Sequence, residues 1–417
     1  MHDDLCKDYD DYDTEKALDP TSTTTAVLSD AWYNETYLPF RECGNLVQCL
    51  ATGAPLPYGG VAPPWSNWSV YDSFMTKTVQ TVVASGRSVN YWDLVNEPPA
   101  RGPLNDLYLD FKSSSVLTTD DLEQWLLHTY DDVKAADPNA QVVCPSLEGY
   151  DDYPGEAPAN SQLLDFSTFL AFAAANHMNC NAFSWHEIND IGSATDFNMQ
   201  PEDIVAHVFR SRTLLAQYPQ FKGAQIFINE YGAFTPLGGS QTYESMPGWT
   251  VGYIAALEQA GVNEANRSCT PNKGCADLLD DLLVHSGGTL EPSHAYWPYW
   301  FYAQMNGAVV PVTSSAEAVS GFAALDTAQR TLRILLGRHE IQVSGNRNGQ
   351  SASIAVAVPW SSPSVQVQLQ PFANGAGAEF QPPVTTQTVP VTHGSVTISL
   401  PYLGPENAYG ITVTPLS

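Results

Sequence analysis

The chain has 417 residues, of which 43% are hydrophobic, so it is long enough for one large domain and a second, smaller one. Its 17 Lys and Arg stand against 45 Asp and Glu, and the net charge of −28 argues against nucleic acid or an anionic membrane surface as a partner. The sequence has no apolar run of about 18 residues and therefore predicts no membrane-spanning segment, whereas a neutral polymer such as a glycan stays possible.

The first 48 residues carry no clear pattern of strands or helices. The pattern then predicts a strand at residues 49–56 and a helix at 70–84. From about residue 88, apolar strand-like runs alternate with amphipathic segments. Strands are predicted at 88–95, 141–144, 180–185, 224–229 and 294–302, and helices at 118–136, 163–175, 202–216 and 317–336.

The helix at 118–136 illustrates the pattern. Thr118 or Thr119 can cap its start, acidic residues fill its first turn, and its apolar residues form one stripe: Leu122, Trp125, Leu126 and Val133. Strands that alternate with such helices predict a parallel sheet. Counted back from the last helix, the five strands are numbers four to eight of a (β/α)8 barrel, with strand three at 49–56 and strands one and two within the poorly placed first 48 residues.

The sequence pattern changes after Gly337, where apolar and polar residues alternate and no helix pattern intervenes. Strands are predicted at 351–358, 364–369, 384–391, 395–400 and 409–413, which is typical of an antiparallel β-sandwich. The predicted domains are therefore a barrel at residues 1–338 and a β-sandwich at 339–417. The long segment at 236–292 either walls off a cleft or forms a flexible rim.

The cysteines allow several pairings. Cys43 with Cys49, and Cys269 with Cys275, lie six residues apart in loop-like sequence and can close small disulfide loops. Cys144 and Cys180 lie in predicted strands, as buried thiols or as a pair joining neighbouring strands. We find no Cys and His spacing of a zinc site and expect no metal and no organic cofactor.

Three glycosylation sequons, at Asn34, Asn67 and Asn266, give weak support for secretion. No apolar signal segment follows Met1, which fits a mature form, a sequence that has lost its start, or an intracellular protein. Of these we expect a secreted glycoprotein whose start is missing.

Two predicted strands end abruptly in a carboxylate, at Glu97 and at Glu230. A glutamate at the end of a buried strand is costly unless something uses it. Glu148 and Glu187 also follow predicted strands, and barrel enzymes place their catalytic groups at these strand ends. Retaining glycosidases need two carboxylates, one to attack the anomeric carbon and one to protonate the leaving oxygen. We expect Glu148 and Glu187 to bind substrate hydroxyls or to support the site from behind.

The segment Asn96-Glu97-Pro98 resembles the acid/base motif of clan A glycoside hydrolases. The resemblance implies that Glu97 is the acid/base and that Asn96 binds the sugar 2-hydroxyl. Residues 228–232 look like the nucleophile strand of that clan, with Glu230 as nucleophile and Tyr231 beside the substrate.

Further positions follow the same resemblance. His186 matches a residue that hydrogen-bonds the nucleophile, and Trp297 and Trp300 match aromatic residues that floor the sugar site. The order of the motifs and the trailing β-sandwich are most similar to glycoside hydrolase family 39, the β-xylosidase and α-L-iduronidase family. This implies a retaining hydrolase acting on a plant- or microbial-type polysaccharide or oligosaccharide.

Other interpretations stay open at the level of sequence. The chain is alternatively another clan A endo-glycanase, such as a glucanase or mannanase, or a glycan-binding barrel without activity. His186 is alternatively a satisfied core histidine, and Trp297 and Trp300 can simply fill the barrel. The sugar, the linkage, exo against endo cleavage and the oligomeric state are not fixed by these patterns.

Overall fold

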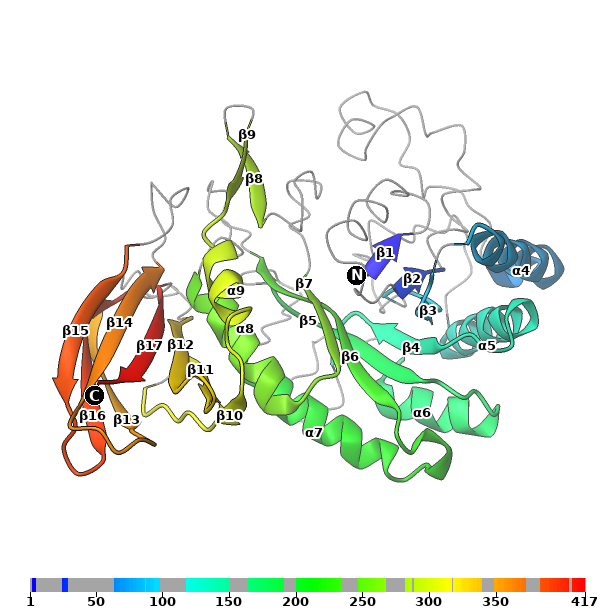
Figure 1. Ribbon diagram of the computed structural model, residues 1–417. Helices are drawn as coiled ribbons and strands as arrows, with labels where there is room; N and C mark the ends of the chain where they lie inside the picture. The colour runs from blue at the N-terminus through cyan, green and yellow to red at the C-terminus, as the bar shows by residue number, and fades with distance from the viewer. Residues whose placement is uncertain are drawn as a thin grey trace.

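The computed structural model describes a parallel sheet with outer helices and an antiparallel β-domain, which lie beside one another (Figure 1). All structural statements below concern the described residues, which are 2–4, 25–28, 64–86, 88–97, 118–150, 164–190, 200–234, 247–267, 282–286, 289–316, 318–339, 349–372, 383–404 and 407–416.

The parallel sheet has seven described strands, and their order in the sheet follows their order in the chain. They are β1 (His2–Asp4), β2 (Thr25–Val27), β3 (Tyr91–Asp93), β4 (Val142–Leu147), β5 (Ala182–Asp190), β6 (Gln225–Phe234) and β7 (Glu264–Arg267). Every neighbouring pair is parallel, as strand–helix alternation predicts. The sheet curls into a half-barrel (Figure 1), and its closure into a full (β/α)8 barrel stays a prediction.

Helices cover the outer face of the curled sheet (Figure 1). They are α4 (Trp68–Ala84), α5 (Thr119–Ala136), α6 (Phe166–Ala175), α7 (Asp203–Leu215) and α8 (Pro247–Ala260). Capping begins several of them: Thr118 and Asp121 form a capping box at α5, and the Asp165 side chain accepts from the backbone of α6. The predicted strands from 88 to 229 and helices from 70 to 216 are confirmed, while α8 and β7 were not predicted.

The β-domain spans residues 308–416 and consists of a six-stranded sheet and a two-stranded sheet that enclose an apolar core. The larger sheet has the order β10 (Ala308–Val310), β11 (Val319–Asp326), β12 (Thr331–Arg338), β17 (Ala408–Pro415), β14 (Ser364–Phe372) and β15 (Thr385–Pro390). The smaller sheet pairs β13 (Gln350–Ala357) with β16 (Ser395–Leu403). All five strands predicted after residue 350 are confirmed.

The helix predicted at 317–336 is wrong, because these residues form the antiparallel hairpin β11–β12. Both faces of the hairpin are buried: Leu332 and Ile334 face the β-domain core, whereas Leu335 packs against α8. A strand buried on both faces loses the apolar–polar alternation by which strands are recognised. The larger sheet thus begins before the boundary that the sequence placed at 338/339.

The strand predicted at 294–302 is also wrong, because the structure has helix α9 (Tyr296–Tyr302) there. Pro298 lies in the first turn, where a missing N–H costs nothing. Trp297 and Phe301 lie four residues apart on one helix face and are both buried. The aromatic composition suggested a strand, but the spacing of the buried residues is that of a helix.

A disulfide joins Cys144 on β4 to Cys180, which lies just before β5. This confirms one of the two alternatives for that pair. The strand predicted at 49–56, the first 48 residues apart from β1 and β2, and the pairs Cys43/Cys49 and Cys269/Cys275 lie outside the described residues. None of the described helices has the length and apolar character needed to cross a membrane.

We predict that Leu335→Ala lowers the free energy of unfolding by about 2–5 kcal/mol, because it opens a cavity between β12 and α8. Urea denaturation measures this loss. Val309→Ala on β10 is the matched control, since Val309 is 60% exposed and its truncation should cost less than about 0.5 kcal/mol. Equal losses in the two variants would contradict the packing described here.

Candidate active site

The inner face of the curled sheet is built in layers. The lowest described layer is apolar and takes one side chain from each of β3, β4, β5 and β6: Tyr91, Val143, Ala182 and Phe227. Such layers, each filled by side chains from neighbouring strands, are how a barrel interior packs. The next inward-facing side chains along these strands form the layer above it, nearer the carboxyl ends of the strands.

The second layer is polar and fully buried. Its centre is the side-chain amide of Asn229 on β6, whose Nδ2 lies 2.6 Å from Asp93 Oδ2, 2.9 Å from Ser146 Oγ and 3.2 Å from Ser184 Oγ. All four side chains have zero exposure. Buried polar groups are stable when hydrogen-bonded, so this layer ties four adjacent strands together.

An irregularity in β6 brings two consecutive side chains to the inner face. Trp185 pairs with Ile228 and His186 pairs with Glu230, so Asn229 is an extra residue in the register. Trp185 packs outward against Phe166 of α6, and the alternation of β5 therefore turns His186 inward. The bulge allows both Asn229 and Glu230 to face inward, which a regular strand does not permit.

Glu97 follows β3 in a left-handed backbone conformation, with φ of 45°. Its backbone N–H donates to the carbonyl of Ser146 at 3.0 Å, which anchors the end of β3 to β4. Non-glycine residues in this region are strained and occur preferentially at functional sites. The left-handed backbone of Glu97 is therefore a feature expected of a functional residue.

The third layer brings Glu97, His186 and Glu230 together. His186 Nδ1 lies 2.9 Å from Glu97 Oε1 and 3.9 Å from Glu230 Oε2. One oxygen of each carboxylate and one ring nitrogen of His186 all lie within 4.8 Å of one another. The His186 side chain is fully buried, whereas Glu97 and Glu230 are 20% and 23% exposed, so a ligand can reach both carboxylates but not the imidazole.

The charges of this layer fix the protonation state of His186. Burial by itself lowers the pKa of the imidazole, but Glu230, the hydrogen bond with Glu97 and the more distant Asp93 outweigh it and raise that pKa to about 9. His186 is therefore an imidazolium at neutral pH, and its Nδ1–H donates to Glu97. The sequence predicted a contact with Glu230, and the structure places His186 between both carboxylates.

Glu97, His186 and Glu230 are also the one group of described residues with the ligand spacing of a metal site. A metal would have to displace the Nδ1 proton, because a protonated ring nitrogen has no lone pair to offer. The raised pKa of His186 makes that exchange costly at neutral pH.

Asn96 lies three residues after the end of β3 and Glu148 directly after β4, and both are half-buried. Asn96 is thus beside Glu97 in the chain, and Glu148 lies at the carboxyl end of β4, which neighbours β3 and β5 in the sheet. Their roles as ligands of substrate hydroxyls stay predictions.

Glu187 lies on the opposite side of β5 from His186, because successive side chains alternate. Its Oε1 accepts from Trp185 Nε1 at 2.5 Å and lies 2.8 Å from His207 Nδ1 on α7, and both Glu187 and His207 have zero exposure. The structure thus does not bring Glu187 to the carboxylate pair, and it gives this residue buried partners between sheet and helix.

The predicted aromatic residues lie around α9. The Tyr231 hydroxyl is 2.6 Å from that of Tyr299, which links the residue after Glu230 to this helix. Trp297 packs in an apolar cluster between α8 and the β-domain, and Trp300 lies 5.8 Å from it between ring centroids. The structure gives Trp297 a packing role, and stacking of either Trp on a sugar stays a prediction.

Sequence reasoning did not single out Asp93, Asn229, Ser146 or Ser184. A signal was present, because Asp93 and Asn229 interrupt otherwise apolar strands just before Glu97 and Glu230. Polar residues within a buried strand require partners, and partners on adjacent strands are the simplest supply.

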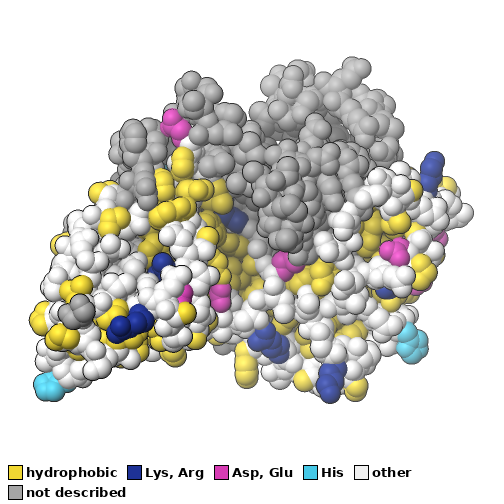
Figure 2. Space-filling model, in the orientation of Figure 1, with side chains coloured by type: hydrophobic (Ala, Val, Ile, Leu, Met, Phe, Trp, Pro, Cys, Tyr) yellow, Lys and Arg dark blue, Asp and Glu magenta, His cyan; other side chains and the backbone are white. Residues whose placement is uncertain are grey.

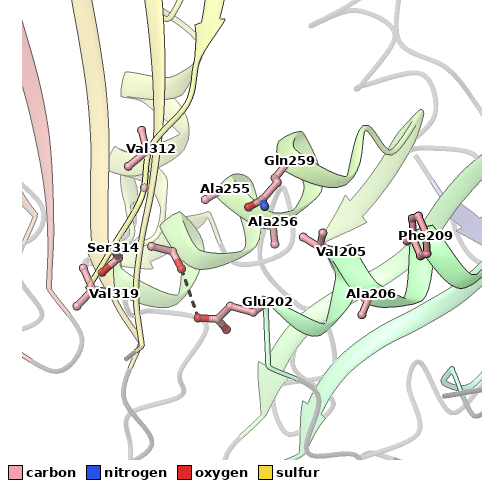
Figure 3. A pocket seen from close by; sticks show the side chains of 12 residues that line it. Glu202, Val205, Ala206, Phe209, Ala255, Ala256, Gln259, Val312, Ser314 and Val319 are labelled. Atoms are coloured by element: carbon pink, nitrogen blue, oxygen red, sulfur yellow. Dashed lines mark hydrogen bonds between the residues drawn. The ribbon is translucent and has the colours of Figure 1, made fainter. Parts of the chain in front are cut away.

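A separate groove of about 550 Å³ lies between α7, α8 and the β-domain (Figure 3). Phe209 of α7 and Gln259 of α8 line it, and the Glu202 carboxylate at its edge accepts from Ser320 Oγ at 3.4 Å and lies 3.1 Å from His339 Nε2. None of the candidate site residues lines this groove. On the face in Figure 2, the charged side chains of described residues are few and scattered.

The structure is similar to several solved structures, some of which are named as glycoside hydrolases. N2152 from Neocallimastix frontalis has a TM-score of 0.64 at 16% identity, and the match covers 100% of this chain and 95% of that one. A glucosidase from Croceicoccus marinus has a TM-score of 0.57 at 13% identity, with 94% and 90% covered. A GH39 enzyme from Xanthomonas axonopodis pv. citri has a TM-score of 0.56 at 13% identity, with 100% and 93% covered.

These similarities show that the chain has a glycoside hydrolase fold. No family model and no curated protein matches the sequence. At such low identity a shared fold does not transfer an activity.

We predict a pH-dependent contribution of His186 to stability. Its pKa is about 9 in the folded protein and 6.5 as the reference, so the contribution is fully present below pH 6.5 and is lost as the pH rises through 9. Urea denaturation of wild type and His186→Gln should show a difference that shrinks by the order of 3 kcal/mol over this range. The partly exposed His128 supplies the control variant His128→Gln, and a pH-independent difference for His186→Gln would contradict the ion pair.

We predict that Glu187→Gln lowers stability and leaves KM within about twofold, because the side chain holds α7 and not the substrate. Steady-state kinetics and urea denaturation of one preparation separate the two effects. A KM raised tenfold in a folded variant would instead restore Glu187 as a substrate ligand.

Proposed function

We propose that this protein is a retaining glycoside hydrolase that cleaves O-glycosidic bonds by double displacement, with Glu97 and Glu230 as its two catalytic carboxylates. The observation that carries the proposal is their spacing: an oxygen of Glu97, which follows β3, and an oxygen of Glu230, which lies within β6, are within 4.8 Å of each other. The fold shared with a glucosidase and a GH39 enzyme supports it independently.

The spacing favours retention over inversion. Carboxyl groups about 5–5.5 Å apart allow one of them to attack the anomeric carbon directly, whereas inverting enzymes keep about 6.5–9.5 Å to accommodate a water molecule. Oxygens of Glu97 and Glu230 that lie within 4.8 Å of each other support the shorter, retaining arrangement. Their partial exposure lets a glycoside contact both.

The chemistry proceeds in two steps. Glu230 attacks the anomeric carbon while Glu97 gives its proton to the leaving oxygen, so that a glycosyl–Glu230 ester forms and the alcohol departs. Glu97 then takes a proton from water, the water oxygen attacks the anomeric carbon, and the bond to Glu230 breaks. The configuration of the anomeric carbon is inverted twice and therefore retained.

The roles of the two carboxylates follow the resemblance of Asn96-Glu97-Pro98 to the clan A acid/base motif. His186 can interact with either carboxylate, because its Nδ1 lies near both. Its hydrogen bond favours the charged form of the carboxylate that accepts it. A proton on Glu97 turns this hydrogen bond into a weaker one to a neutral carboxyl oxygen. The positive charge of His186, 3.9 Å from Glu230 Oε2, then favours Glu230 as the attacking anion.

The substrate we propose is a neutral glycan, with a β-xylosidase-like specificity as the finer hypothesis. The structural neighbours include a glucosidase and a bifunctional glucanase-xylanase from a metagenome library, so enzymes named for different glycan activities share this fold. An endo-glycanase is the second enzyme candidate, and a glycan-binding barrel without turnover is the non-enzymatic one.

We predict that Glu97→Gln lowers kcat by about 10²–10⁴-fold for aryl glycosides with poor leaving groups, and that Glu230→Gln lowers kcat by at least about 10³-fold for all of them. A panel of aryl xyloside, arabinoside, glucoside, galactoside, mannoside and uronides identifies the sugar. Glu123→Gln on α5 is the matched control and should retain wild-type activity.

Turnover that survives both substitutions would overturn the proposal. Binding of an oligosaccharide by calorimetry, without turnover of any aryl glycoside or polysaccharide, would establish the binding-only alternative. Loss of activity after dialysis against a chelator, restored by a divalent cation, would show that the three clustered residues hold a metal.

A further inference from the structure

The polar layer around Asn229 lies beneath Glu97 and Glu230 and takes no direct part in the proposed chemistry. Asn229 precedes Glu230 and is the extra residue of the β6 bulge. Without a bulge, the side chains at positions 229 and 230 point to opposite faces of the sheet. The inward direction of Glu230 therefore depends on the contacts that hold the Asn229 side chain on the inner face as well.

What holds Asn229 is a set of acceptors on three other strands. An amide nitrogen has two hydrogens to donate, and the two shortest contacts go to Asp93 Oδ2 on β3 and Ser146 Oγ on β4, at 2.6 and 2.9 Å. The bond to Asp93 is charge-assisted and is the shortest of the layer. It thereby joins the strand before Glu97 to the strand that carries Glu230.

Asp93 is a buried carboxylate with zero exposure, so the fold keeps it at a cost that needs compensation. The compensation comes from Asn229 and from the positive charge of His186 in the layer above. Asp93 is thus connected to both parts of the site: through the Asn229 amide to the bulge, and through its charge to the imidazolium.

We propose that Asp93 and Asn229 are positioning residues of the site: the Asn229 amide, held by the Asp93 carboxylate, maintains the β6 bulge that turns Glu230 toward Glu97. This inference rests on the proposed function, because it assigns what places the nucleophile for attack. Neither residue touches the reacting atoms.

Exchange of the two side chains is the experiment that tests the pairing. Asp93→Asn keeps the shape and an acceptor oxygen but removes the charge, and kcat should fall by about 10–100-fold. Asn229→Asp places two carboxylates 2.6 Å apart and should lower kcat by at least about 100-fold.

The double variant Asp93→Asn/Asn229→Asp again has one amide and one carboxylate across the same contact. It should recover kcat to within about tenfold of wild type, with KM within about threefold in all three variants. Recovery of kcat by the exchange, at unchanged KM, is not expected from a merely structural pair whose loss only lowers the folded fraction.

Thr129→Val is the matched control. It removes a buried hydrogen bond of 2.6 Å to Tyr71 between α4 and α5, so it tests what loss of a comparable bond elsewhere does. Its urea midpoint should fall while kcat stays at the wild-type value. Urea denaturation of every variant gives the folded fraction, to which kcat is normalised.

The inference is overturned if Asp93→Asn, the isosteric and mildest change, keeps wild-type kcat, or if the folded double variant is no better than the worse single variant. Glu230→Gln, assayed in parallel, separates this failure from failure of the proposed function. If Glu230→Gln is active, the proposed function fails. If Glu230→Gln is inactive while the layer variants keep full kcat, only the positioning role fails.

Discussion

The central interaction of this structure is the buried imidazolium of His186 between two partly exposed carboxylates. A buried imidazolium is costly unless it is paired. His186 is paired twice: Glu97 Oε1 accepts a hydrogen bond from Nδ1 at 2.9 Å, and Glu230 Oε2 lies 3.9 Å from the same nitrogen. The same charge holds the two carboxylates together, although they repel each other when both are ionised. The spacing of the two carboxylates therefore depends on this one buried group.

The fold serves this interaction by stacking layers on the inner face of the sheet. An apolar layer fills the bottom, the Asn229 amide network ties four strands above it, and the bulge in β6 adds Glu230 to the inward-facing set. On the outer face, α8 and α9 are covered by β12, with Leu335 and Trp297 in one cluster. The β-domain therefore packs against the helices that follow the Glu230 strand, and Tyr299 of α9 contacts Tyr231 directly.

The sequence contained enough information for the strand–helix alternation, the antiparallel domain and the convergence of Glu97, His186 and Glu230. Periodicity succeeded where elements have one buried and one exposed face. It failed at β11 and β12, because both faces of that hairpin are buried, and at α9, because aromatic composition outweighed helical spacing. The sequence also could not decide whether His186 or Glu187 points to the inner face of the sheet, because that depends on the register of β5. The bulge at Asn229 is a shift in the register between β5 and β6, which only the pairing of the two strands reveals.

Trapping of the covalent intermediate tests the central claim most directly. The probe is an activated 2-deoxy-2-fluoro glycoside of the sugar that the enzyme hydrolyses fastest, because the fluorine slows both steps and the good leaving group preserves the first. Digestion and tandem mass spectrometry then locate the adduct. We predict one glycosyl ester, on Glu230, that disappears on incubation with an acceptor alcohol. An adduct on Glu97, or rapid turnover of the unmodified substrate with no adduct on either carboxylate, would contradict the account.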